Sequence, residues 1–250
     1  MNIAQKVIVV IGAAQGLGKA IASKLALHGA TLFICDIHDE EGEAVAAFLE
    51  KTGLKARFIH LDVTDEQQWK DLYAKIIELE GRLDVLVNNA GINIRNTIET
   101  MTLEEFNMML AVNVSGPFMG IKHAIPLMRA NKGGSIINIS SICGLIGHQF
   151  TTEAYTITKG ALTLMTKTIA VRYAKDNIRC NSIHPSTVET DLVRKLFEDS
   201  AKKAERIGEI PLGRIASLDD VAHAVLYLAS DEASFLNGVA LPVDGGLTSY

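Results

Sequence analysis

Two kinds of segment alternate along the whole of this 250-residue chain, and this alternation is what most constrains its fold. Short, continuously apolar runs rich in β-branched residues are followed by longer segments with the periodicity of amphipathic helices. Continuous apolar runs of this length are typical of strands buried on both faces, as in parallel sheets joined by helical crossovers. The alternation therefore predicts an α/β fold: a doubly wound, seven-stranded parallel sheet with helices on both faces.

The predicted elements follow the alternation directly. We expect strands at residues 6–11, 31–35, 56–60, 84–87, 134–139, 178–184 and 239–243. We expect helices at residues 17–28, 39–51, 65–80, 102–111, 117–130, 153–175, 190–206 and 218–229. Because no linker, repeat or change of composition divides the chain, a single domain spanning residues 1–250 is expected.

One stretch is less regular than the rest. Residues 186–216 are rich in charged side chains and have only scattered large apolar ones. This pattern is typical either of a mobile helical lid, at about 186–210, or of a solvated surface helix.

Two histidines precede this stretch in the chain. His148 is either a substrate contact or a solvated loop residue, and we expect His184 to pack beneath Pro185.

Composition excludes several classes of function. With 24 basic and 29 acidic residues, the chain has a formal net charge of −5, which argues against nucleic acid as its main partner. Its three cysteines are widely spaced and form no CxxC motif, so a reducing, cytoplasmic setting is expected. The apolar run at 7–14 is too short to span a membrane, so no membrane partner is expected. No histidine or cysteine cluster predicts a metal site.

A glycine-rich turn follows the first predicted strand and opens the first helix, at Gly12-Ala13-Ala14-Gln15-Gly16-Leu17-Gly18. Such a turn lets the backbone approach a pyrophosphate, and the helix N-terminus offers free N–H groups. Asp36 ends the second strand, where a carboxylate can accept hydrogen bonds from an adenosine ribose and repel a 2′-phosphate. No lysine or arginine stands at positions 13, 14 or 37. These features predict a dinucleotide cofactor, NAD rather than NADP; the plainer alternative is that Asp36 only caps a loop.

Tyr155 and Lys159 lie four residues apart and so share one face of the helix predicted at 153–175. A lysine ammonium beside a phenol favours the phenolate and can lower the pKa of the tyrosine from about 10 toward the working range of a general acid–base. Ser141 follows the fifth strand, at the sheet edge where ligands bind in open α/β folds. Because a Tyr/Lys pair at this spacing is common on helix surfaces, the spacing alone does not establish a site.

The Gly-xxx-Gly-x-Gly spacing and four further motifs resemble the short-chain dehydrogenase/reductase family, in its branch of about 250 residues with a single-domain Rossmann fold. The resemblance spans residues 6–246. The further motifs are Asn88-Asn89-Ala90-Gly91, Asn113-Val114-Ser115-Gly116, Tyr155-Thr156-Ile157-Thr158-Lys159 and Pro242-Val243-Asp244-Gly245-Gly246. Two positions depart from the family pattern. Ile11 stands where the family has threonine, and Ser186 stands where it usually has glycine, which would be costly if the backbone there had a positive φ.

The resemblance implies a site. Its catalytic residues would be Asn113, Ser141, Tyr155 and Lys159, with Tyr155 as the general acid/base. Its cofactor contacts would be Gly12, Gln15, Gly16, Leu17, Gly18, Asp36, Ile37, Asp62, Val63, Asn89, Ala90, Gly91, Tyr155, Lys159, Pro185, Val188 and Thr190.

The resemblance also implies an activity: an NAD-dependent oxidoreductase that interconverts a secondary alcohol and a ketone. The segments expected to line the substrate pocket carry apolar side chains, which favours a cyclic, steroid-like or aryl substrate; these are Ile142, Leu145, Ile146, Phe150, Leu192, Leu196 and Phe197. Asn93 and Arg95 leave room for a polar or anionic group. The alternatives are a 3-oxoacyl-[acyl-carrier-protein] reductase and a non-catalytic NAD-binding scaffold.

The segments at 102–130 and 153–175 carry broad apolar faces, which first indicate packing on the sheet. In the family that the chain resembles, the corresponding helices also form a dimer interface, and tetramers are common. We therefore expect a homotetramer.

Overall fold

The computed structural model describes residues 1–250, with the side chains of Leu192 and Leu196 left out. Its seven strands form one parallel sheet in the order β3-β2-β1-β4-β5-β6-β7, which confirms the predicted doubly wound fold. The strands are β1 (Val7–Ile11), β2 (Thr31–Asp36), β3 (Lys55–His60), β4 (Val85–Asn88), β5 (Gly134–Ile139), β6 (Ile178–Pro185) and β7 (Ala240–Val243).

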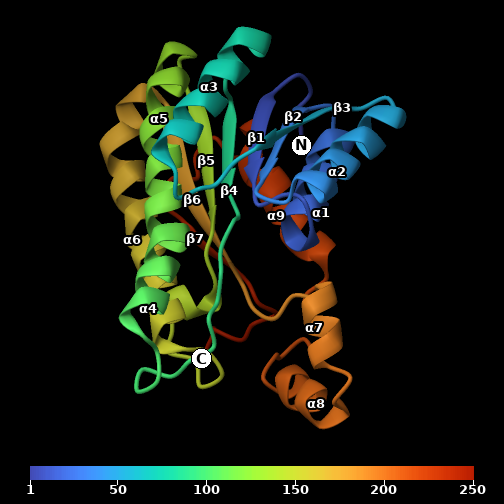
Figure 1. Cartoon of the computed structure of the whole chain (residues 1–250), viewed down its shortest axis with the longest axis vertical. Helices are drawn as coiled ribbons and strands as arrows, with labels where there is room; N and C mark the ends of the chain where they lie inside the picture. Colours follow the sequence, from blue (N-terminus) through green and yellow to red (C-terminus); the bar gives the residue numbers. More distant parts are fainter.

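Three long helices cover each face of the sheet (Figure 1). One face carries α1 (Gly16–Leu27), α2 (Asp39–Lys51) and α9 (Leu218–Ala229); the other carries α3 (Glu66–Glu80), α5 (Gly116–Ala130) and α6 (Glu153–Tyr173). β1 divides its side chains between the two cores: Ile8 and Val10 pack with one set of helices, while Val7, Val9 and Ile11 pack with the other. The continuous apolar runs are therefore explained by burial on both faces.

The segment predicted as two helices at 102–111 and 117–130 is instead one continuous helical path. α4 (Leu103–Leu110) passes through a π-helical turn at Ala111–Ser115 directly into α5. Pro117 follows this turn and has no N–H to donate to the carbonyl four residues before it, so a regular α-helical bond is missing here. The predicted break was wrong, but the same residues produce a local widening of the helix.

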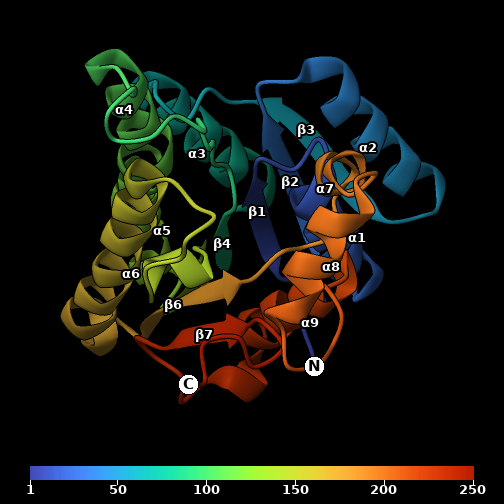
Figure 2. The ribbon, with the colours of Figure 1, turned by 90° about the horizontal axis from the view of Figure 1, so that it is seen from below.

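The helix predicted at 190–206 was also wrong, because the structure divides it into α7 (Asp191–Leu196) and α8 (Ser200–Gly208). Asp199 causes the division: its Oδ1 accepts hydrogen bonds from the backbone N–H groups of Ala201 (3.0 Å) and Lys202 (3.3 Å) and so starts a new helix. Figure 1 shows both helices at the lower end of the molecule. Figure 2, viewed from below, shows them on one side and the segment leading into α6 on the other.

Three short 3₁₀ turns complete the structure, at Ile142–Gly144, Ala174–Asp176 and Asp231–Ala233. In the described part of the chain, every helix falls short of the length or apolarity needed to cross a bilayer.

Candidate active site

The site predicted from the sequence lies at the carboxyl ends of the strands. Strand order reverses between β1 and β4, so the loops that follow these two strands diverge and leave a crevice between them. Segments from five strands meet at this edge, namely residues 12–18, 36–38, 89–91, 140–144 and 186–190.

The phosphate-binding turn is held in a shape that only glycine permits. Gly12 has a φ of 73°, and a Cβ there would lie 2.7 Å from the Cα of Ala90. A Cβ on Gly18 would lie only 1.9 Å from the carbonyl oxygen of Gly12. Asn89 donates from Nδ2 to the carbonyls of Gly12 (2.8 Å) and Ile11 (3.2 Å). The Asn89 amide thus braces the turn at the place where Ile11 lacks the hydroxyl of the family pattern.

The turn has the features that a pyrophosphate requires. Gln15 is the N-cap of α1 and makes no side-chain capping bond, and the first N–H groups of a helix have no partner within the helix. Gly16 has space beside it, since the nearest atom to an added Cβ would be the Cγ2 of Thr190, 4.0 Å away. A helix N-terminus with free donors and an open glycine suits the diphosphate of a dinucleotide. Leu17 packs into the core and anchors the first turn of the helix.

Asp36 is buried at the end of β2 and ties two loops together. Its Oδ2 accepts a hydrogen bond from the Ala14 N–H (3.0 Å), and its Oδ1 accepts one from the His38 N–H (3.2 Å). The Nδ1 of His38 lies 2.8 Å from the same Oδ1, and this hydrogen bond raises the pKa of His38. Asp36 therefore does cap a loop, while it also lies beside the exposed side chain of Ile37, where an adenosine ribose is expected.

His38 was not among the predicted site residues, because only lysine and arginine were expected as cations near this position. The signal was the Asp-x-His spacing: an aspartate side chain commonly bonds to the backbone two residues ahead, which brings the side chain there alongside.

Asp62 and Val63 follow β3, next to β2, as expected for adenine contacts. The Oδ1 of Asp62 accepts hydrogen bonds from the N–H (2.9 Å) and hydroxyl (2.7 Å) of Thr64. The carbonyl of Val63 accepts a hydrogen bond of 3.0 Å from the buried indole of Trp69. These bonds fix the loop beside the Asp36 end of the crevice.

Asn113 lies in the π-helical turn and is almost fully buried. Its Oδ1 accepts from the N–H of Ile92 (2.8 Å), while its Nδ2 donates to the Ile92 carbonyl (2.8 Å) and to the hydroxyl of Thr158 (3.1 Å). This one amide joins the loop after β4 to α6. A Cβ on Gly91 would lie 3.3 Å from the Oδ1 of Asn113 and 3.4 Å from the Nζ of Lys159, so the loop passes directly over both.

Lys159 and Tyr155 face each other on the first turns of α6. The Nζ of Lys159 lies 5.6 Å from the centre of the Tyr155 ring and donates to the carbonyl of Ile139 (2.9 Å). Burial lowers the pKa of Lys159 to about 8. Burial also raises the pKa of Tyr155 well above its usual value, although hydrogen bonding to Ser141 opposes the rise. The expected lowering of the tyrosine pKa is not what the structure shows, because the ammonium lies toward the ring and the Ile139 carbonyl while burial disfavours the phenolate.

Ser141 lies immediately after β5, where its Oγ accepts a hydrogen bond of 3.2 Å from the N–H of Cys143. The adjacent Ser140 bonds instead to the backbone, donating to the carbonyl of Lys159 (3.1 Å). Asn113, Ser141, Tyr155 and Lys159 are thus brought to one edge of the sheet.

The segment after β6 reaches the glycine-rich turn, because Thr190 lies 4.0 Å from the position of a Cβ on Gly16. Pro185 and Val188 are buried, and Thr190 caps α7 through a 3.3 Å bond from the N–H of Val193. Ser186 does not have a positive φ, so the cost expected of serine there does not arise. Its Oγ is buried and has no hydrogen-bond partner among the residues that the structure describes.

The predicted lid meets the opposite wall of the site through charged and aromatic side chains. Glu209, just after α8, places Oε2 3.4 Å from the Nε2 of His148 and 3.5 Å from the Nη1 of Arg206. The guanidinium of Arg206 lies 3.4 Å from the centre of the Phe150 ring, a cation–π contact. His148 therefore lies beside Glu209 of the lid segment. The side chains of Leu192 and Leu196, expected in the pocket, lie outside the described residues.

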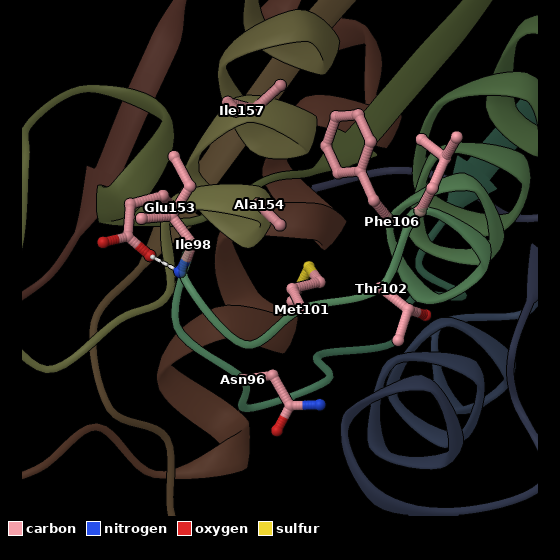
Figure 3. A pocket seen from close by; sticks show the side chains of 9 residues that line it. Asn96, Ile98, Met101, Thr102, Phe106, Glu153, Ala154 and Ile157 are labelled. Atoms are coloured by element: carbon pink, nitrogen blue, oxygen red, sulfur yellow. Dashed lines mark hydrogen bonds between the residues drawn. The ribbon is translucent and has the colours of Figure 1, made fainter.

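A separate cavity of about 300 Å³ lies between α4 and the start of α6 (Figure 3). Its lining consists of Asn96, Ile98, Met101, Thr102, Leu103, Phe106, Glu153, Ala154 and Ile157. Its polar side chains are already paired: Asn96 donates to Glu105 (2.8 Å), and Glu153 accepts from the N–H of Ile98 (3.2 Å). This cavity differs from the pocket expected around residues 142–150. Within the described part of the chain, His, Cys, Asp and Glu side chains form no metal-binding group of three or more.

Comparison with known proteins identifies relatives along the whole chain. The family model described as enoyl-(acyl carrier protein) reductase matches residues 12–248. Trans-4-hydroxycyclohexanecarboxylate dehydrogenase of Sinomonas cyclohexanicum is 42% identical over 99% of this chain and 95% of its own length. Cyclopentanol dehydrogenase of Comamonas testosteroni is 40% identical over 98% of this chain and 97% of its own.

A solved structure has the same fold as this chain. It is a Beutenbergia cavernae protein, described as a candidate NAD(P)-dependent gluconate 5-dehydrogenase, that holds NADP at low occupancy. It superposes with a TM-score of 0.93 and 30% identity, covering 100% of this chain and 99% of its own.

The Asp36–His38 pair leads to a prediction about pH. Because its folded-state pKa is raised, His38 contributes stability that is fully present below its unfolded pKa and is lost as pH rises through the folded value. Replacing Asp36 with asparagine removes the carboxylate, so we expect the pKa of His38 to fall toward the ordinary value of 6.5. Histidine ring signals followed by NMR across pH 5–9 measure this, with His38→Asn identifying the His38 signal. An unchanged His38 pKa in Asp36→Asn would contradict the pairing.

Proposed function

Because the chain belongs to the short-chain dehydrogenase/reductase family, we propose that it is an NAD-dependent oxidoreductase that interconverts a secondary alcohol and a ketone by hydride transfer. It acts on CH–OH groups, as its named relatives do. The observation that carries the proposal is the meeting of Asn113, Ser141, Tyr155 and Lys159 beside the glycine-rich turn, with Gly91 lying over two of them.

In the proposed reaction, Tyr155 is the general acid/base. During alcohol oxidation its phenolate accepts the hydroxyl proton, and during ketone reduction the phenol returns a proton to the oxygen. The Ser141 hydroxyl donates a hydrogen bond to that oxygen and stabilises charge developing on it. A bound NAD supplies the hydride acceptor. Because burial raises the pKa of Tyr155, the resting phenol is protonated, which is the form that reduction requires.

Lys159 and Asn113 support Tyr155 in different ways. Lys159 places its Nζ 5.6 Å from the centre of the phenol ring, and this Nζ is the donor proposed for the cofactor ribose. Asn113 holds the loop after β4 against α6, and so fixes the distance between the cofactor side of the crevice and Tyr155. We assign to Asn113 the family's role in a water path that carries the proton to solvent.

The turn at residues 12–18 would hold the cofactor diphosphate, and Asp36 would accept hydrogen bonds from the adenosine ribose. Asp36 accepts two hydrogen bonds from His38 at Oδ1 and one from Ala14 at Oδ2, which leaves a free lone pair on Oδ2 for the ribose. NAD is preferred over NADP in this proposal, because the buried carboxylate repels a 2′-phosphate and positions 13, 14 and 37 carry alanine and isoleucine.

We infer an apolar cyclic, steroid-like or aryl substrate. The relatives named above act on a hydroxycyclohexanecarboxylate and on cyclopentanol, both cyclic alcohols. Leu145 and Phe150, on the segment between Ser141 and Tyr155, are partly exposed and offer an apolar surface close to the proposed catalytic groups.

The alternative is a 3-oxoacyl-[acyl-carrier-protein] reductase, which needs cations for an acidic carrier protein. Arg129 and Lys132, near the end of α5, could form such a patch, but Arg129 is paired with Asp176 at 2.9 Å. This pairing disfavours that alternative. The presence of all four proposed catalytic side chains disfavours a non-catalytic scaffold.

We further infer a homotetramer in the cytoplasm. Of the apolar side chains on α4 to α6, Met109, Ile121 and Leu162 are buried, but others are not. The exposed set lies on the outer faces of the same helices and comprises Leu103, Met108, Phe118, Ile157, Leu164 and Val171. An exposed apolar surface of this kind is typical of an oligomer interface. The cysteines, all buried and free among the described side chains, suit a reducing compartment.

Tyr155→Phe removes only the phenolic oxygen. We expect it to bind NADH normally and to lose turnover by at least about 100-fold, the usual contribution of a general acid–base. Steady-state rates with cyclic secondary alcohols and NADH fluorescence titration measure the two properties. Tyr227→Phe on α9 is the control and should behave as wild type. Full activity of Tyr155→Phe would rule out the proposed chemistry.

Asp36→Ala tests the cofactor preference. Loss of the carboxylate removes ribose acceptors and the repulsion of a 2′-phosphate, so we expect the ratio of kcat/KM for NAD to that for NADP to fall by about tenfold or more, equivalent to about 1.4 kcal/mol. Asp39→Ala, an exposed aspartate nearby, serves as the control. If the ratio is the same in wild type and Asp36→Ala, NAD preference has another origin.

Leu164→Glu tests the assembly. Leu164 is 66% exposed on α6, so a charge there leaves the subunit core intact but disrupts an interface built on this helix. We expect wild type to be tetrameric and the variant to dissociate, as measured by light scattering at micromolar concentration. A monomeric wild-type protein would contradict the proposal.

A further inference from the structure

His184 is a fully buried imidazole within β6, between Ile183 and Pro185. Both ring nitrogens are bonded. Nδ1 lies 2.7 Å from the carbonyl oxygen of Ser141, and Nε2 lies 2.8 Å from the Oγ of Ser182. The sequence predicted only that His184 packs beneath Pro185, and neither of these hydrogen bonds was expected.

These partners determine the tautomer. A carbonyl oxygen can only accept, so the proton of the ring is on Nδ1, and Nε2 accepts a hydrogen bond from the Ser182 hydroxyl. Burial lowers the pKa of His184 below its ordinary value of 6.5; the bond to the Ser141 carbonyl opposes this and the charges of Lys159 and Lys167 add to it, so the ring is neutral at pH 7. A neutral ring with one tautomer is a rigid donor pointed at Ser141.

Ser141 needs such a donor because it lies just beyond the sheet. The last bond along this edge runs from the N–H of Ser140 to the carbonyl of Ile183 (2.8 Å). One residue later, the carbonyl of Ser141 accepts from the N–H of Gly144 (2.9 Å), which belongs to the same short turn and moves with it. His184 supplies the bond that fastens this carbonyl to the sheet.

We propose that His184 is a positioning residue: by holding the Ser141 carbonyl to β6, it fixes the direction in which the Ser141 hydroxyl faces Tyr155. This inference rests on the proposed function, in which that hydroxyl bonds to the substrate oxygen. Without this bond, Ser141 could move away from β6 together with its turn, and its hydroxyl would move away from the substrate oxygen. Misplacing one donor slows the reaction more than it weakens binding, because the bond is strongest in the transition state.

Two amide variants separate the two ring nitrogens. In His184→Asn the side-chain N–H lies as many bonds from the backbone as Nδ1 does, so it can still donate to the Ser141 carbonyl. In His184→Gln the amide reaches toward the position of Nε2, so it keeps the Ser182 partner and leaves the Ser141 carbonyl without its donor. We expect kcat to fall about tenfold or more in His184→Gln with KM and NADH affinity nearly unchanged, and within about threefold of wild type in His184→Asn.

A double-variant cycle shows whether the effect passes through Ser141. In a Ser141→Ala background the hydroxyl is gone, so His184→Gln should then reduce kcat by less than about twofold. Full loss in that background, or equal losses in the Asn and Gln variants, would overturn the inference. If Ser141→Ala alone keeps full turnover, the proposed role of Ser141 fails, which is a separate result.

One measurement needs no variant and therefore does not depend on variants that fold. Nitrogen NMR of histidine-labelled wild-type protein distinguishes the two neutral tautomers. We expect the His184 signal to show a protonated Nδ1 and an unprotonated Nε2 from pH 7 to 8. An Nε2-protonated ring, or a charged one, would contradict the proposed bond to Ser141.

Discussion

The simultaneous pairing of β1 with β2 and with β4 is the constraint on which the site depends. Because β1 lies between these two strands, the chain leaves the sheet in opposite directions on its two sides, and the loops after β1 and β4 separate. The glycine-rich turn occupies one side of that opening, and the loop at residues 89–92 occupies the other. Continuous apolar strands make this arrangement stable, since both faces of the sheet are buried.

Side-chain amides convert the opening into a defined site. Asn89 spans from the loop after β4 to the carbonyls of Ile11 and Gly12, and Asn113 spans from the helix layer to Ile92 and Thr158. An amide both donates and accepts, so one buried side chain can fasten two backbones without burying a charge. The proposed cofactor and catalytic halves of the site are therefore held in fixed relation by neutral groups.

Much of this was predictable from the sequence for physical reasons. The strands and most helices were found within one or two residues, because burial pattern and length specify them locally. The two errors in the predicted helices both arise where a single residue changes the hydrogen bonding that its neighbours favour. Pro117 changes the hydrogen bonding of a helix without ending it, and Asp199 starts a new helix inside a helical pattern. Hydrophobic periodicity is insensitive to both effects.

The sequence by itself determined the α/β class, the turn at residues 12–18 and the identities of the four proposed catalytic side chains, since spacing along one strand or helix is a local property. Only the tertiary structure decided how those groups are tuned and held. The pKa of Tyr155 depends on how deeply its ring is buried, and the bonds from His38 to Asp36 and from His184 to Ser141 depend on loops that meet in space. Burial and hydrogen bonding between elements are set by how the elements pack, and spacing along the chain does not contain that information.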